Sequence, residues 1–114
     1  MPPRFNPLKL NKLQLKTLVL LQELARSPRT SMPNNESGDV LITLLPQPHG
    51  NHFHIGSRVV MAKDASGLRN ENVWRALERK GLARSHFPLG ISLTPDGLCY
   101  ETNLGDQILI GADH

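Results

Sequence analysis

The chain has 114 residues, the length of one domain, and 39% of them are hydrophobic, enough to build a single core. Only 20% are charged, which is too few for a disordered acidic or basic tail. Cys99 is the one cysteine, so an internal disulfide framework and a multi-cysteine zinc site are excluded. These properties exclude a multidomain enzyme and a disulfide-rich secreted module, and they favour a small domain that binds rather than catalyses.

The distribution of apolar residues suggests neither export nor membrane insertion. The first residues carry prolines and no apolar run, and the longest apolar run, Leu18–Leu21, is far shorter than the roughly 20 residues of a membrane span. We therefore expect a cytoplasmic protein with no membrane contact. We expect residues 1–10 to form a flexible basic segment, residues 11–110 a single domain, and residues 111–114 a tail.

The net charge of +3 is unevenly distributed. Basic residues exceed acidic residues by four in residues 1–22 and again by four in residues 57–86, whereas residues 87–114 hold four acids and no lysine or arginine. This pattern favours one surface suited to a polyanion, and the alternative is an ordinary charged surface of a soluble protein.

The first predicted element is a helix over residues 12–26. Asn11 and Gln14 form a variant of the capping box, and Ser27-Pro28 ends the helix. Its apolar residues occupy more than half of the circumference, more than one core face requires: Leu10, Leu13, Leu15, Leu18, Val19, Leu20, Leu21 and Leu24. Two interpretations remain, a homodimer through helix 12–26 or coverage by a hairpin of the same chain.

A loop and a hairpin should follow. Residues 27–38 have the composition of a loop, and the apolar run at 40–45, with residues 52–55, predicts a β-hairpin. A helix over 40–45 is the alternative, because short apolar runs are ambiguous.

Three histidines, at positions 49, 52 and 54, stand at H-x-x-H-x-H spacing in this region. Histidine is the commonest metal ligand, and residues two apart on a strand share a face. We nevertheless expect a polar outer face of the hairpin rather than a metal site, and we expect no cofactor.

Two further helices are predicted in the middle of the chain. Ser57 caps a helix over residues 58–65, and Asn70 caps a helix over residues 71–80 that Gly81 ends. The second helix buries one face, on which Trp74 is a core anchor.

Residues 82–86 and 90–94 predict two strands joined by a tight turn. Thr94 and Pro95 then begin a helix that runs to about Asn103, and Cys99 should be a small buried residue. The predicted core consists of Leu13, Leu20, Leu21, Leu24, Val59, Val73, Leu77, Leu82, Ile91, Leu93 and Leu98.

This order of elements is that of an α+β winged helix-turn-helix domain with an additional β-hairpin after the first helix. Residues 72–82 (Asn-Val-Trp-Arg-Ala-Leu-Glu-Arg-Lys-Gly-Leu) resemble a recognition helix and its exit. Residues 91–98 (Ile-Ser-Leu-Thr-Pro-Asp-Gly-Leu) resemble the second wing strand and following helix of MarR-like (multiple-antibiotic-resistance-regulator) and related bacterial regulators. The resemblance covers residues 57–101. It implies a DNA-binding transcriptional regulator whose helix 71–80 enters the major groove of double-stranded DNA.

The candidate DNA-binding residues lie on that helix, at its two ends and on the wing. Arginine can pair with guanine, and asparagine with adenine, through two hydrogen bonds. Basic side chains on the wing are suited to phosphate groups or to the minor groove. The candidates are Arg69, Asn72, Arg75, Arg79, Lys80, Arg84 and His86.

Two carboxylates weaken this interpretation. Glu71 and Glu78 lie on the same helix face, so the alternative is a solvated helix with a Glu71–Arg75 pair in a winged-helix module that binds protein or self-associates. The sequence contains no G-x-S-x-G, G-K-[ST], H-E-x-x-H or paired-carboxylate arrangement, so we do not expect an enzyme.

Overall fold

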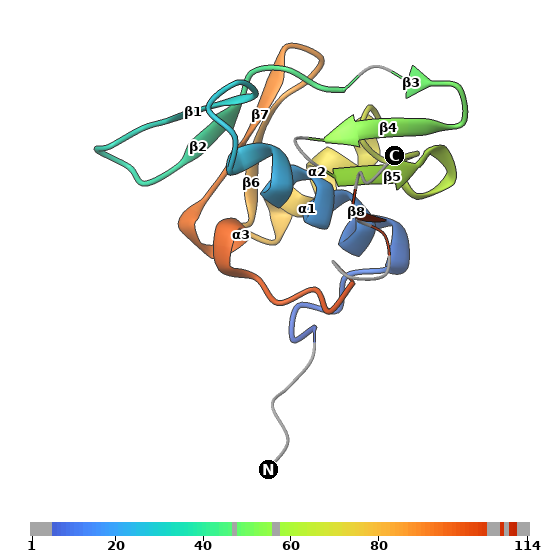
Figure 1. Ribbon diagram of the computed structural model, residues 1–114. Coiled ribbons are helices and arrows are strands. Elements are labelled where there is room, and N and C mark those ends of the chain that lie inside the picture. The colour runs from blue at the N-terminus through green and yellow to red at the C-terminus, as the bar shows by residue number, and fades with distance from the viewer. Residues whose placement is uncertain (1–5, 47, 56–57, 105–107, 109, 112–114) are drawn as a thin grey trace.

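The computed structural model describes residues 6–46, 48–55, 58–104, 108 and 110–111 (Figure 1). Helices and strands are mixed along the chain. In order, the elements are α1 (Lys12–Ala25), β1 (Ser31–Pro33), β2 (Val40–Ile42), β3 (Pro48–His49), β4 (His52–Ile55), β5 (Arg58–Met61), the 3₁₀ turn η1 (Ala62–Asp64), α2 (Glu71–Arg79), β6 (Ala83–His86), β7 (Gly90–Leu93), α3 (Pro95–Cys99) and β8 (Ile110–Gly111).

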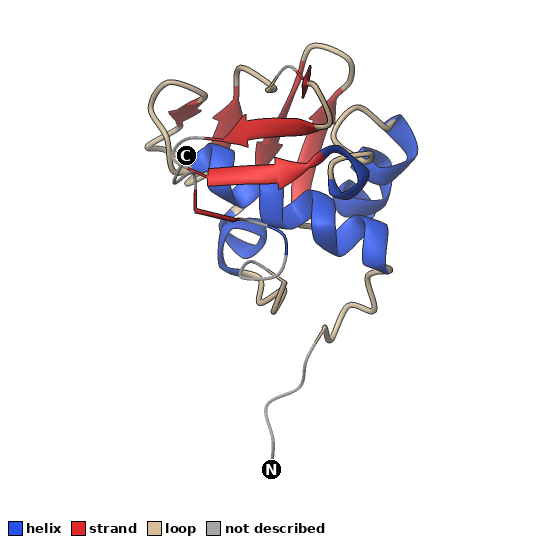
Figure 2. Cartoon of the chain, turned by 45° about the vertical axis from the view of Figure 1, so that its right-hand side comes forward, coloured by secondary structure: helices blue, strands red, loops and turns tan. Residues whose placement is uncertain are grey.

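The strands of the described residues form two antiparallel four-stranded sheets. The first has the strand order β1–β2–β7–β6 and the second the order β3–β4–β5–β8. Helix α1 runs through the centre between them, contacting β1, β2 and β7 of the first sheet and β4 of the second (Figure 1). Figure 2 shows the strands gathered in the upper part of the view, with most of the helical ribbon below them. An α+β fold, as the sequence predicts, is therefore confirmed.

Helix α1 is the predicted first helix. Its capping box is present, because the Asn11 side chain accepts a hydrogen bond from the Gln14 amide at 2.8 Å and the Gln14 side chain accepts one from the Asn11 amide at 3.0 Å. Leu15 and Val19, on the apolar surface that suggested a homodimer, are buried within the chain. The two sheets, α2 and α3 pack around this helix, so Leu15 and Val19 are covered by the same chain.

The predicted hairpin of 40–45 and 52–55 is wrong. Both segments contain strands, but they belong to different sheets: β2 pairs with β1 and β7, and β4 pairs with β3 and β5. The register places Ile42 opposite Ile91 in the core. Burial of such apolar pairs between distant strands outweighs the local hairpin signal. Strand β1 lies in the segment expected to be a loop.

The predicted helix over 58–65 is also wrong. Residues 58–61 form strand β5, and a single 3₁₀ turn follows. Val59 and Val60 are β-branched and favour a strand, where Val60 is buried and Val59 is half-buried. The helix-turn-helix unit therefore lacks its expected first helix, and a winged helix in its predicted form is not present.

The helix predicted over residues 71–80 and the two paired strands predicted after it are confirmed. The Asn70 side chain caps α2 by accepting a hydrogen bond from the Asn72 amide at 3.0 Å. Gly81, at φ +78°, adopts the left-handed conformation that ends the helix. Strands β6 and β7 then pair in register from Ala83↔Leu93 to His86↔Gly90.

Trp74 anchors α2 in the core, as predicted. Its ring is fully buried, and its indole N–H donates a hydrogen bond to the Leu68 carbonyl at 3.0 Å. The ring also meets Phe87 edge to face, with the centroids 4.9 Å apart. This aromatic pair ties the helix to the turn between β6 and β7.

Helix α3 is shorter than predicted. It begins after the Thr94 cap but ends at Cys99, because Tyr100 is already extended. Cys99 is exposed, so its predicted burial is wrong. The Gln22 side chain of α1 donates hydrogen bonds to the carbonyls of Gly97 and Tyr100, both at 2.9 Å, and these bonds hold the exit from α3.

Of the predicted core residues, Leu13, Val59 and Leu98 are half-buried and the others are buried. The segment before α1 was expected to be flexible, yet residues 6–10 are held in place. The Tyr100 hydroxyl donates to the Asn6 side chain at 2.7 Å and accepts from the Leu8 amide at 3.0 Å, while Leu10 is buried. Residues 1–5 and 112–114 lie outside the described residues, and Gly111, expected in the tail, belongs to β8.

Truncation of Leu20 should test the central role of α1. Leu20 is fully buried, so Leu20→Ala should lower the free energy of unfolding by about 2–5 kcal/mol through lost burial and the resulting cavity. Leu89→Ala is the matched control, because Leu89 is 90% exposed and its truncation should change little. Urea unfolding of both variants measures the difference, and equal small effects would contradict the arrangement.

Candidate functional site

The exposed face of α2 carries a row of polar residues that we call the α2 row, made of Asn72, Arg75 and Arg79. All three are exposed, whereas Trp74 and Leu77 on the opposite side are fully buried. Positions three and seven residues apart lie on one side of a helix, so the three side chains share one face. The structure therefore brings together the three residues that the sequence placed on this face.

The ends of α2 extend this basic surface. Arg69 lies just before the Asn70 cap, is exposed and donates a hydrogen bond to the Pro46 carbonyl at 3.4 Å. Lys80 is the exposed C-cap residue. Over residues 69–80 the chain holds four basic and two acidic side chains.

Both carboxylates of α2 have a partner, and one of the two contacts, the Glu71–Arg75 pair, is the one that the alternative interpretation predicted. The Arg75 guanidinium lies 2.7 Å from the Glu71 carboxylate; the Arg75 side chain is largely exposed and that of Glu71 is half-exposed. Glu78 accepts a long hydrogen bond, 3.4 Å, from the Ser85 amide of β6. Within the part of the chain that the structure describes, Arg79 and Lys80 form no ion pair.

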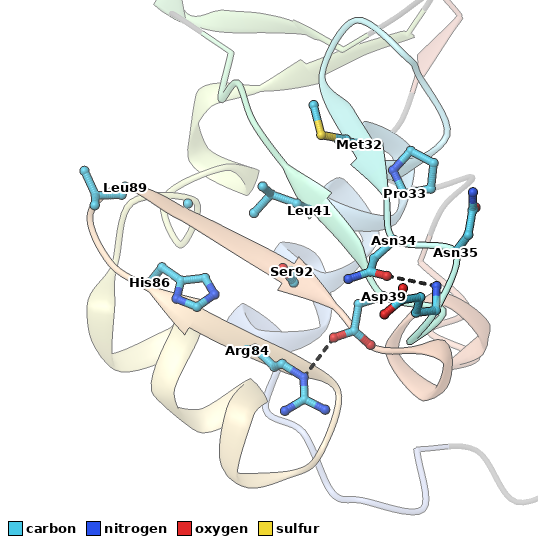
Figure 3. A pocket seen from close by; sticks show the side chains of 12 residues that line it. Met32, Pro33, Asn34, Asn35, Asp39, Leu41, Arg84, His86, Leu89 and Ser92 are labelled. Carbon is cyan, nitrogen blue, oxygen red and sulfur yellow. Dashed lines mark hydrogen bonds and ion pairs between the residues drawn. The ribbon is translucent and has the colours of Figure 1, made fainter.

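Arg84 and His86 lie elsewhere, on the outer face of the first sheet (Figure 3). Their neighbours along β6 and β7, such as Ala83 and Leu93, are buried on the face that packs against the helices. Since strand residues alternate between faces, Arg84 and His86 point away from α2. The structure thus separates these two candidates from the α2 row.

The outer face of this sheet is hollowed into a groove that could not be expected from the sequence. The sheet groove has a volume of about 1020 Å³. Met32, Leu41 and Leu89 supply apolar surface, and the Arg84 guanidinium forms an ion pair with Asp39 at 2.8 Å across it. The groove exists because β1 extends the sheet, and residues 27–38 give too weak a strand signal for this to be predicted.

Neither a metal cluster nor a membrane span was found in the described residues. No group of three or more histidine, cysteine, aspartate or glutamate residues among them is placed to hold a metal ion. No helix among them is long and apolar enough to cross a membrane.

Comparison with known proteins identified no similar protein. The chain matches no family model, and no curated protein or solved structure is significantly similar to it.

The Arg84–Asp39 pair should contribute little to stability. The Asp39 side chain is only 12% exposed, but that of Arg84 is 64% exposed, so solvent screens the guanidinium and the pair should contribute about 0.2–1 kcal/mol, as exposed ion pairs do. A double-mutant cycle with Arg84→Ala and Asp39→Asn, measured by urea unfolding, should give a coupling energy in that range. A coupling well above about 1 kcal/mol would show that the pair is a structural element of the sheet rather than an adaptable lining of the groove.

Proposed function

We propose that this protein is a DNA-binding regulator that inserts α2 into the major groove of double-stranded DNA. The observation that carries the proposal is the α2 row, which presents Asn72, Arg75 and Arg79 to solvent from a helix whose other face is anchored by Trp74. A rigid helix with a narrow polar face is what base recognition requires, because the major groove admits one α-helix.

The surroundings of α2 support this proposal. A winged-helix domain places a β-hairpin directly after its recognition helix, and β6 and β7 form such a hairpin directly after α2. In the same sheet β7 also pairs with β2. This chain differs from a winged-helix domain because strand β5 and the turn η1 lie where the first helix of the helix-turn-helix unit was expected. We therefore propose a variant winged-helix arrangement in which a strand and a turn lead into the recognition helix.

The chemistry assigns different tasks to different residues of this surface. Arg79 is suited to a guanine and Asn72 to an adenine, because each can form two hydrogen bonds with its base. Arg69 and Lys80 stand at the two ends of α2, where they suit the phosphates on either side of the groove. Arg84 and His86, which the sequence suggested as phosphate contacts, are not assigned to DNA here, because they face the opposite side of the sheet.

The Glu71–Arg75 ion pair is compatible with DNA binding. The Arg75 side chain is largely exposed and that of Glu71 is half-exposed, and pairs this open to solvent contribute at most about 1 kcal/mol. A guanine edge or a phosphate can therefore compete for the Arg75 guanidinium. Glu71 would then lower the affinity without preventing binding.

Substitution of the α2 row should weaken DNA binding. Arg79→Ala should lower the affinity for duplex DNA by about fivefold or more, because a two-bond contact between arginine and guanine contributes about 1–3 kcal/mol. Asn72→Ala should lower the affinity with little change in salt dependence. Arg29→Ala is the charge-matched control, since Arg29 is exposed in the loop after α1. Fluorescence anisotropy of labelled duplexes, at several salt concentrations, measures all three variants.

Two outcomes of this experiment would contradict the proposal. The first is no binding of the unmodified protein to duplex DNA at low salt. The second is equal loss in Arg79→Ala and Arg29→Ala, which would indicate attraction by net charge alone. Either outcome favours the protein-interaction alternative, for which the sheet groove is the candidate surface because Met32 and Leu89 at it are 62% and 90% exposed.

Removal of the acidic side chains on α2 should have the opposite effect. Glu71→Gln removes a charge that repels phosphate and also releases Arg75, so the affinity for duplex DNA should rise by about twofold to fivefold. Glu101→Gln is the control for net charge, because Glu101 is exposed beyond α3. The same anisotropy titration compares them, and an equal rise in both variants would argue against α2 as the contact surface.

A further inference from the structure

A pair of histidines on the second sheet brings two metal-ligating nitrogens together, independently of the α2 surface. His52 and His54 lie on β4 two residues apart, and their Nε2 atoms are 3.2 Å from each other. The ring centroids are 4.9 Å apart and the rings are inclined at 74°. His54 is exposed and His52 half-exposed, so solvent reaches the pair.

This separation is that of a hydrogen bond between the two rings, and it also matches the distance between two ligands of one bound ion. Zinc lies about 2.0–2.1 Å from an imidazole nitrogen, so two ligands of a tetrahedral zinc are about 3.3 Å apart. Two ligands at a right angle on one ion would be about 2.9 Å apart. The observed 3.2 Å lies between these values, so both nitrogens can reach one ion with little movement.

The backbone under the pair is held on both sides. On β5, Met61 is the register partner of His52 and Val59 that of His54. On β3, His49 is opposite His52. The intervening Phe53 and the following Ile55 belong to or pack against the core, which fixes the opposite face of β4. Ligands held by a rigid strand lose little freedom when the ion binds.

We propose that His52 and His54 form a binding site for a divalent late transition metal ion such as Zn²⁺, Ni²⁺ or Cu²⁺. Imidazole nitrogens suit these ions, whereas Mg²⁺ and Ca²⁺ take oxygen ligands. With two protein ligands, the other coordination positions are occupied by water or by a donor from elsewhere. This donor set is an open site, unlike the closed four-ligand sites that hold structural zinc.

The test is a calorimetric titration of the full chain, made without a histidine tag, with Zn²⁺ and separately with Mg²⁺. We expect one Zn²⁺ to bind and Mg²⁺ not to bind. His54→Ala should weaken Zn²⁺ binding at least about tenfold, because even loss of an outer-shell partner of a metal ligand costs that much. His86→Ala is the matched control, since His86 is an exposed strand histidine of the other sheet, and it should bind as the unmodified protein does.

His52→Ala should weaken binding as His54→Ala does. Thermal unfolding without metal verifies that each variant is folded, and His54→Ala carries the test because His54 is the more exposed of the pair. Absence of Zn²⁺ binding, or equal binding by the unmodified protein and His54→Ala, would overturn the proposal and leave a histidine–histidine hydrogen bond only. Loss of binding in His49→Ala but not in His54→Ala would overturn it as well.

Discussion

The burial of α1 on almost every side is the constraint on which the rest of the structure depends. Leu18, Leu20 and Leu21 are fully buried although consecutive positions of a helix point in different directions. One packed layer cannot cover such a helix, so the chain surrounds it with two sheets and two further helices. Polar groups on α1 are satisfied inside this envelope: the Lys16 ammonium lies 2.6 Å from the Asp64 carboxylate, and Thr17 donates to the Leu13 carbonyl. The burial of the apolar side chains of α1 therefore determines where each surrounding element packs.

Close backbone contacts follow from this tight arrangement. Gly97 of α3 lies so near the Leu82 carbonyl that an added Cβ would collide with it. Gly67, before α2, leaves equally little room for a Cβ beside the Thr17 hydroxyl. These two glycines permit α3 and the segment leading into α2 to approach the core. The orientation of α2, and hence the direction of the α2 row, results from this packing together with the contact between Trp74 and Phe87.

The surfaces left after the core is covered are of three kinds. The α2 row is a basic helix face, the sheet groove is a partly apolar hollow, and the histidine pair is a small cluster of nitrogen ligands. They lie on different elements, so a substitution in one can be made without disturbing the others. The ion pairs at the first two surfaces, Arg75–Glu71 and Arg84–Asp39, each include a largely exposed arginine, which makes both surfaces adaptable rather than rigid.

The sequence by itself determined the elements whose signals are local. The caps at Asn11, Asn70 and Thr94 act within three residues, and the apolar spacing of α1 and α2 lies within one helix. The starts of α1, α2 and α3 and the exposure of the α2 row could therefore be predicted. Only the tertiary structure decided which strands pair. Val40 pairs with Leu93, and Val60 with Phe53, and a short apolar run carries no information about its distant partner. The separation of Arg84 from α2 was decided in the same way, since it depends on which face of β6 the core buries. The shared face of His52 and His54, by contrast, follows from their spacing on one strand.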